Sequence, residues 1–343
     1  MANVYRADQA GSLIAPPPAA AGSAGADAVK ALLAMQKQCG IDVASDGQVL
    51  RASPCSIFAE RVAGVRSDSE GKTMSAPCVA GPLERKARLT AAEVDLLKRA
   101  ATGAFKITLP APTVAAALMF REGVTDQHYP TRRDLAVALA AIIREEIADL
   151  IGDDVPYIQL DGPAYELATE RGGAAWFGNV DEMLRLDAEA LKDLRKPEKI
   201  ALALRLPRAR HASGAIPPAA GSAEKRAAML ETALTRMPVD RLLIEFPAEP
   251  TEADFGPLRA VPPGKMAVLG LVDPLAPRAN EIDPLLDKLD LAVNFIGAER
   301  LALSPRHGFA ESGGASDANA FEAQRRSLTL TVEAARRFWG FEM

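Results

Sequence analysis

Eight short aliphatic runs recur along the chain, and each is followed by Gly, Pro or Asp and then by a longer stretch with helical spacing. A short apolar run bounded by turn residues is typical of a buried strand. The predicted strands are 4–12, 41–46, 105–109, 157–161, 200–206, 241–246, 266–272 and 300–304. Eight alternating units fit a closed (β/α)8 barrel better than an open α/β sheet, and we expect a single barrel domain over residues 1–343.

Sequence signals typical of helix N-termini support the predicted helices between these strands. Thr131 precedes Asp134 by three residues, and apolar residues then follow at helical spacing up to residue 150. Thr90 and Glu93 have the spacing of a second capping box, and apolar positions over 321–339 predict a terminal helix. Residues 15–25 and 62–88 are predicted as loops. The second is a long insertion after the second strand, and long loops above a barrel often serve as lids.

Composition narrows the range of partners. Forty Lys and Arg residues against forty-five Asp and Glu residues give a net charge of −5, which provides no cationic surface field for nucleic acid or an anionic membrane. No segment approaches the roughly 20 apolar residues of a membrane-spanning helix. The three cysteines show no C-x-x-C spacing, so we expect neither a disulfide framework nor a cysteine-only zinc site. A cytoplasmic protein with a small-molecule substrate fits best.

The carboxyl ends of the predicted strands carry the candidate chemistry, because the loops of a barrel converge there. Polar residues at or just after these ends are Ser12, Asp46, Gln48, Thr108, Gln159, Asp161, Arg205, Glu245, Asp273 and His307. His128 and His211 lie in loops and are interpreted as solvated residues.

Five blocks of sequence stand at these ends. They read Gly-Ser-Leu at 11–13, Ser-Asp-Gly-Gln at 45–48, Lys-Ile-Thr-Leu-Pro at 106–110, Tyr-Ile-Gln-Leu-Asp-Gly-Pro-Ala at 157–164 and Leu-Ser-Pro-Arg-His-Gly-Phe-Ala at 303–310. In content and order they resemble the signature blocks of cobalamin-independent methionine synthases of the C-terminal catalytic domain type. The resemblance implies a (β/α)8 barrel and transfer of a methyl or alkyl group to a thiol held on zinc.

The resemblance also implies where zinc ligands should stand. The family's His-x-Cys motif corresponds to Arg205 and Pro207, its Glu to Glu245 and its last Cys to His307. Arginine and proline side chains do not ligate zinc, so only Glu245 and His307 remain as metal ligands. We therefore expect a degenerate, zinc-poor site and no certain cofactor, with Arg205 supplying positive charge in place of the metal.

The amino-acid pocket of the family is only partly matched. The resemblance assigns substrate binding to Ser12 and Asp161, whereas Gln48 stands where the family has a glutamate. A neutral amide gives up the charge-assisted part of a hydrogen bond to an amino group. Asp46, Gln48 and Gln159 complete the predicted substrate-binding set, and homocysteine itself is a doubtful substrate.

Three functions compete. The first is methionine-synthase-like transfer of a methyl or alkyl group to a thiol or a related small anionic acceptor. The second is a metal-independent lyase or hydrolase, with His307 as general base, Glu245 or Asp161 as its carboxylate partner and Arg205 as an anion clamp. The third is a noncatalytic small-molecule-binding barrel.

The position of Arg205 predicts a specific contact. Alternation with Ala203 turns Arg205 toward the barrel interior, where a guanidinium needs a carboxylate partner. Glu245 ends the next strand, so we expect an Arg205–Glu245 ion pair in the volume where relatives hold zinc.

Overall fold

The sheet at the centre of the protein contains six parallel strands in the order β3-β4-β5-β6-β7-β8. A computed structural model describes residues 4–16, 24–67, 77–163, 165, 177–208, 222–274, 282–310 and 318–340. The strands are β3 (Lys106–Pro110), β4 (Tyr157–Asp161), β5 (Ala201–Leu206), β6 (Arg241–Glu245), β7 (Met266–Val272) and β8 (Leu301–Pro305). Six of the predicted strands are thereby confirmed to within a residue at each end. They were readable because strands buried on both faces are nearly continuous apolar runs.

The first two predicted strands need correction, because each is reduced to a single bridge. Ala7 pairs in parallel with Leu303 of β8, and Ala44 pairs in parallel with Phe105 just before β3. The carboxylate of Asp42 explains part of the loss: it accepts hydrogen bonds from the backbone N–H groups of Arg6 at 2.6 Å and Ala7 at 2.9 Å. A side chain thus takes donors that a regular ladder would use. The two segments still flank the two edges of the sheet.

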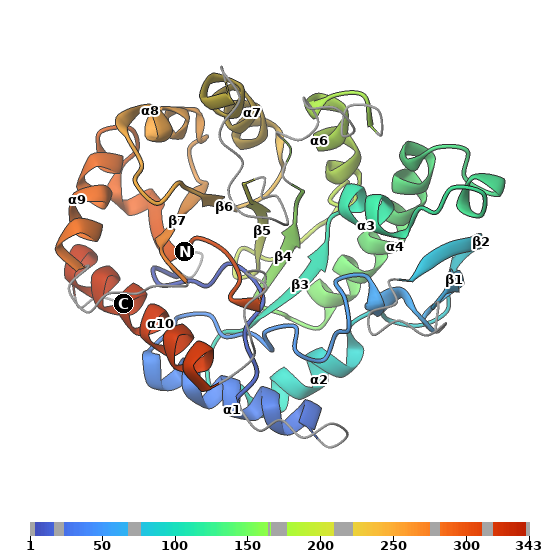
Figure 1. Ribbon diagram of the computed structural model, residues 1–343, viewed down its shortest axis with the longest axis horizontal. Coiled ribbons are helices and arrows are strands. Elements are labelled where there is room, and N and C mark those ends of the chain that lie inside the picture. The colour runs from blue at the N-terminus through green and yellow to red at the C-terminus, as the bar shows by residue number, and fades with distance from the viewer. Residues whose placement is uncertain are drawn as a thin grey trace.

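Helices surround the strands, as Figure 1 shows. The longer ones are α1 (Ala24–Cys39), α2 (Ala91–Ala100), α3 (Pro112–Met119), α4 (Arg132–Gly152), α6 (Val180–Glu189), α7 (Ser222–Arg236), α9 (Ile282–Val293) and α10 (Ala318–Trp339). The described helical elements also include a short α8 (Glu252–Phe255) and the 3-10 turns η1 (Ser56–Phe58), η2 (Thr125–Gln127), η4 (Gly256–Ala260) and η5 (Ala298–Arg300). Within the described ranges, no helix combines the length and apolar character needed to cross a membrane.

The two predicted capping boxes have different outcomes. At α4 the box is confirmed, because Thr131 accepts from Asp134 N at 3.1 Å and Asp134 accepts from Thr131 N at 3.1 Å. At α2 the box is wrong, although the helix begins where expected. The Thr90 hydroxyl donates instead to Glu146 at 2.6 Å, and Glu93 binds Arg51. Tertiary partners outcompete the local cap.

The predicted loop over 62–88 is also wrong. Strands β1 (Val62–Arg66) and β2 (Cys78–Arg85) form an antiparallel pair there, at the periphery of the molecule in Figure 1. The pair is fixed to the core by Val62 and Val79, and Tyr129 accepts a hydrogen bond from Leu83 N at 2.9 Å. Alternating apolar residues on one face give it the pattern of a half-buried strand pair. Of the other predicted loop, 15–25, residues 17–23 lie outside the described residues, and α1 begins at Ala24.

Candidate functional site

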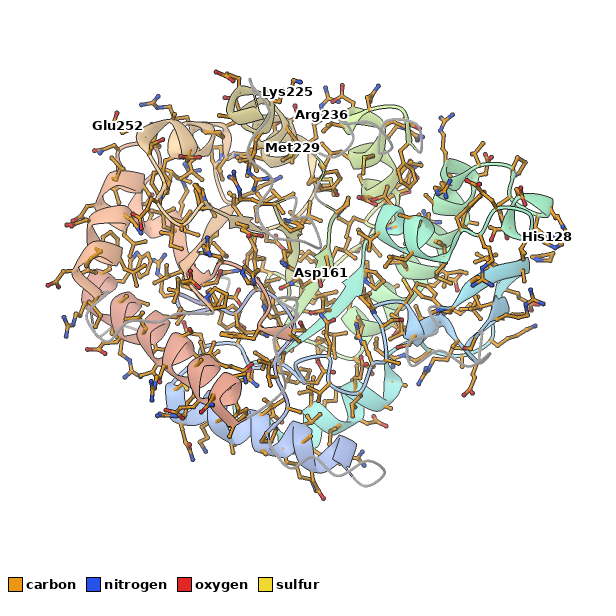
Figure 2. The ribbon with its side chains drawn as sticks, viewed as in Figure 1. His128, Asp161, Lys225, Met229, Arg236 and Glu252 are labelled. Carbon is orange, nitrogen blue, oxygen red and sulfur yellow. The ribbon has the colours of Figure 1, made fainter. Side chains whose placement is uncertain are left out.

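Asp161 and Arg205 lie at the carboxyl ends of neighbouring strands and are directly in register. Arg205 Nη1 is 3.9 Å from Asp161 Oδ2, with the Arg205 side chain 8% exposed and that of Asp161 21% exposed. Figure 2 shows Asp161 near the middle of the ring of elements. Residues in register on adjacent strands point to the same face of the sheet. The two side chains therefore lie close together at the carboxyl ends of their strands.

Glu245, the predicted ion-pair partner of Arg205, is displaced along its strand. The residue of β6 in register with Arg205 is Leu243, so Glu245 is two residues farther along. Two residues correspond to about 6.6 Å of strand. Glu245 Oε2 instead accepts a hydrogen bond from Arg208 N at 3.0 Å. Among the described residues, Asp161 rather than Glu245 lies within ion-pair distance of Arg205.

A strained turn brings Gln48 to Asp161. Both Gly47 (φ 67°) and Gln48 (φ 58°) have left-handed backbone conformations, which are costly for a residue with a side chain. A Cβ on Gly47 would lie 2.6 Å from the Cβ of Leu13, so this close approach requires glycine. The turn directs Gln48 Nε2 to within 3.4 Å of Asp161 Oδ2. The glutamine that the sequence placed in the substrate pocket therefore contacts the predicted binding carboxylate.

Gln159 supports Asp161 from within the strand layer. Its Nε2 donates to Asp161 Oδ1 at 2.7 Å and to the carbonyl of Ala10 at 2.9 Å. Its Oε1 accepts from Lys106 Nζ at 2.9 Å, and Lys106 is paired with Asp8 at 2.8 Å. Burial lowers the pKa of Lys106, an effect that the charge of Asp8 opposes. A hydrogen-bonded chain thus runs from the buried ion pair to the strand-end carboxylate.

A third ion pair, which the sequence analysis missed, lies beside Asp46. Arg51 binds Glu93 through two bonds, from Nε at 2.8 Å and from Nη2 at 2.6 Å. Burial and the charge of Glu93 raise the pKa of Asp46 to about 6, which Arg51 only partly offsets. Asp46 Oδ1 accepts from Gln48 N at 3.1 Å, while Oδ2 is buried without a partner among the described residues. No sequence pattern links positions 51 and 93, because the contact is purely tertiary.

The remaining predicted residues are not joined to this cluster by a contact in the described part of the chain. His307 is buried, and its Nδ1 lies 2.9 Å from the carbonyl of Gly308. Ser12 is half-buried, and its carbonyl accepts from Phe309 N at 2.8 Å. Asp273 pairs with Arg306 at 3.0 Å. His128 is exposed at the edge of the molecule in Figure 2, as expected for a solvated residue, and His211 lies outside the described residues.

Metal ligands do not gather in the described ranges, where no group of three or more His, Cys, Asp or Glu side chains could hold an ion. A hollow of about 320 Å³ lies elsewhere, where α1 meets the segment between α2 and β3. Its lining includes Asp42 and Ala104. Both lie several residues before the carboxyl ends at which the candidate polar residues stand. The residues at the strand ends, rather than this hollow, carry the concentrated polar chemistry.

Parallel strands with helices outside define an α/β protein, and its polar side chains gather at the carboxyl ends of the strands, where ligand sites of such proteins lie. Residues 20–190 match the family model described as "Cobalamin-independent synthase, Catalytic domain". The chain belongs to the cobalamin-independent methionine synthase family, which is a family of methyltransferases.

Several relatives are similar to this chain. A methionine synthase of Sulfolobus acidocaldarius is 29% identical over 166 residues, which are 46% of this chain and 47% of the relative. A methionine synthase of Saccharolobus islandicus is 31% identical over 156 residues, which are 44% and 45% of the two chains. The chain thus spans about half the length of these curated relatives. The uncharacterized protein YxjH of Bacillus subtilis is 24% identical across 98% of this chain and 95% of its own.

Two solved structures share the fold along nearly the whole chain. A protein of Listeria monocytogenes described as a vitamin-B12-independent methionine synthase superimposes with a TM-score of 0.75 at 19% identity, covering 99% of each chain. A B12-independent methionine synthase of a Shewanella species, solved in complex with selenomethionine, gives 0.74 at 20% identity, covering 97% of this chain and 98% of its own. At such identities the likeness shows the fold alone.

Proposed function

We propose that the protein is an enzyme that transfers a methyl or alkyl group to a small thiol or a related anionic acceptor, bound at the carboxyl ends of β4 and β5. The observation that carries this proposal is the buried guanidinium of Arg205 beside the partly exposed Asp161. A cation close to a thiol favours the thiolate, which is the reactive nucleophile. Arg205 supplies such a cation at the strand end, and Asp161 supplies an acceptor for an amino group.

The donor set does not fit a zinc ion. A stable site uses three or four sulfur, nitrogen or oxygen ligands. Arg205 and Pro207 occupy two of the family's four ligand positions and offer none. The proposed transfer therefore has no metal-dependent step. The proposed site is zinc-poor, and of the family's ligand positions only those of Glu245 and His307 carry donors.

The transfer step balances without a further reactant. The acceptor sulfur forms a bond to the methyl carbon while the bond from that carbon to the donor atom breaks. The donor atom keeps the electron pair of the broken bond and takes up the proton that the thiol has released. A thiol and a methyl donor thus become a thioether and the protonated donor, while Arg205 stabilises the sulfur anion and Asp161 orients the acceptor.

Two comparisons support an amino-acid-like ligand. The curated relatives of Sulfolobus and Saccharolobus carry the name methionine synthase, and the Shewanella neighbour was solved with selenomethionine. In our proposal Asp161 accepts from the amino group, and Ser12, Asp46 and Gln48 line the surrounding pocket. The net charge of −5 supports a small-molecule partner rather than nucleic acid or a membrane.

We infer further that the sheet closes into a single (β/α)8 barrel domain over residues 1–343. Two contacts support closure: Ala7 bridges to β8 and Ala44 bridges to the start of β3. Asp42 N donates to the carbonyl of Ala7 at 3.1 Å, which joins the two segments to each other. The three cysteines are free and buried, which supports a reducing compartment such as the cytoplasm.

Calorimetric titration with L-methionine and L-homocysteine tests the proposed site. We expect the wild type to bind at least one of them, and Asp161→Asn to lower the affinity at least about tenfold, because it removes the charge facing the amino group. Asp154→Asn is the matched control, since Asp154 precedes the same strand and pairs with Lys199 at the exposed surface. Unchanged affinity in Asp161→Asn, or a large fall in its Tm, would contradict the proposal. Transfer itself is assayed by mass spectrometry of the methylated thiol.

A further inference from the structure

The side-chain amide of Gln159, next to Asp161, has both its nitrogen and its oxygen engaged in hydrogen bonds. Gln159 is fully buried, and both of its amide hydrogens are committed, to Asp161 Oδ1 and to the carbonyl of Ala10. Its oxygen accepts from the ammonium of Lys106. Lys106 also donates to Asp8 at 2.8 Å and to the carbonyl of Gln9. Gln159 therefore has no hydrogen left for a substrate, although the sequence placed it among the binding residues.

These contacts permit only one orientation of the amide. A reversed amide would set its oxygen against two acceptor oxygens, of Ala10 and Asp161, and its nitrogen against the ammonium of Lys106. Buried polar groups left in such mismatched contacts are strongly disfavoured. The N–H of Gln159 is thus permanently directed at Asp161 Oδ1.

We propose that Lys106 and Gln159 are positioning residues, an inference that rests on the proposed function. They present Asp161 to the site only as a hydrogen-bond acceptor, so the ligand group that faces Asp161 must be a donor such as a primary ammonium. Neither residue touches the ligand. Their effect reaches it through the orientation and charge of Asp161.

The charges around Asp161 act in the same direction. Arg205 of β5 lies 3.9 Å away, and Gln48 is a neutral donor at 3.4 Å. Lys106 of β3 and Arg51, which follows the turn at Gln48, attract the Asp161 charge at longer range. Each of these three cations attracts the negative charge of Asp161, and a carboxylate can only accept hydrogen bonds.

Gln159→Glu is the decisive variant, because it keeps the contact with Lys106 and replaces the N–H facing Asp161 with an oxygen. Two carboxyl groups in hydrogen-bond contact must share a proton near neutral pH. We expect the affinity for L-methionine at pH 7 to fall at least tenfold and to recover as the pH is raised to 8.5. The wild type should change by less than about threefold over that range, since its carboxylate has no acidic neighbour at this contact.

Lys106→Met tests the far end of the chain. It leaves the oxygen of Gln159 without its donor, so the preference for L-methionine over 4-(methylthio)butanoate, which lacks the amino group, should fall at least threefold. Should this variant not fold because Asp8 loses its partner, Gln159→Glu, which retains that ion pair, decides the proposal. Tyr157→Phe is the matched control, since it removes the 2.8 Å bond to Asp8 from the same buried network without contacting Gln159. It should lower Tm while leaving the affinity and its pH profile unchanged.

Wild-type affinity with a flat pH profile in Gln159→Glu would overturn the proposal, as would equal changes in Tyr157→Phe. If the wild type binds neither L-methionine nor L-homocysteine, the proposed function fails instead. The positioning roles are then decided in the ligand-free protein by carbon-13 NMR titration of the Asp161 carboxyl. Gln159→Glu should raise its pKa by at least about one unit, and an unchanged titration would refute the proposal.

Discussion

Replacing Arg51 with methionine should destabilise the protein far more than the same replacement in an exposed ion pair of equal geometry. The side chains of Arg51 and Glu93 are 4% and 9% exposed, and two bonds of 2.6 and 2.8 Å join them. Burial opposes the charge of Arg51, but Glu93 outweighs it and raises the pKa of Arg51. Arg51→Met leaves a buried carboxylate without its partner, which costs about 3–5 kcal/mol.

Arg185→Met provides the comparison that isolates burial. Arg185 binds Glu182 through bonds of 2.8 and 2.7 Å, with side chains 49% and 21% exposed. Solvent screens this pair, so the loss should stay under about 1 kcal/mol. Both variants are measured by urea unfolding, with Arg51→Met/Glu93→Gln closing a double-mutant cycle whose coupling we expect at about 1–3 kcal/mol. Equal losses at the two arginines, or an additive cycle, would refute the reasoning.

Three further outcomes can be measured. The purified protein should hold less than one zinc per chain by elemental analysis, because Arg205 and Pro207 cannot ligate it; one zinc that survives dialysis against a chelator would contradict this. Gly47→Ala should cost at least about 2 kcal/mol, since its Cβ would lie 2.6 Å from Leu13, whereas Gly123→Ala, also at positive φ but with open space, should cost about 1 kcal/mol. Burial and Glu93 raise the pKa of Asp46 to about 6, so its folded form binds the proton more tightly than its unfolded form. As the pH rises from about 4 to about 6, the free energy of unfolding of the wild type should therefore fall relative to that of Asp46→Asn, by on the order of 1–3 kcal/mol in urea unfolding. A pH-independent difference between the two proteins would refute this.

The sheet was predictable from sequence where packing alone sets the pattern. Strands β3 to β8 are buried on both faces, and their aliphatic runs mark them to within a residue. The first segment departed from prediction in part because the Asp42 side chain takes backbone donors of Arg6 and Ala7. Similarly, the capping box at Thr90 failed because Glu146, 56 residues away, binds the hydroxyl. Local patterns cannot show which distant polar group will compete for a donor.

The candidate site was only partly predictable, in its members as well as in their pairing. Strand ends identified Gln48, Asp161 and Arg205, and the structure brings these three together. Strand order alone suggested Glu245 as the ion-pair partner of Arg205. The partner depends on the register between β5 and β6, which no sequence pattern shows. Arg51, which acts on both Asp46 and Asp161, carried no motif that would have selected it.

The contrast between two of the ion pairs of the site, Arg51–Glu93 and Arg205–Asp161, bears on how a ligand could bind. Arg51 and Glu93 are joined by two short bonds and buried, so separating them is costly. Arg205 and Asp161 are held 3.9 Å apart, and Asp161 is partly exposed. In the proposed function, a zwitterionic ligand replaces this 3.9 Å contact with two charge-assisted hydrogen bonds, its ammonium to Asp161 and its anionic group to Arg205. This exchange compensates the desolvation of both Arg205 and Asp161 only if the ligand carries an ammonium and an anionic group. A neutral or singly charged competitor is therefore disfavoured. In the proposed function, the buried pair of Arg51 and Glu93 holds the frame of the site, and we expect recognition at the partly exposed pair of Arg205 and Asp161.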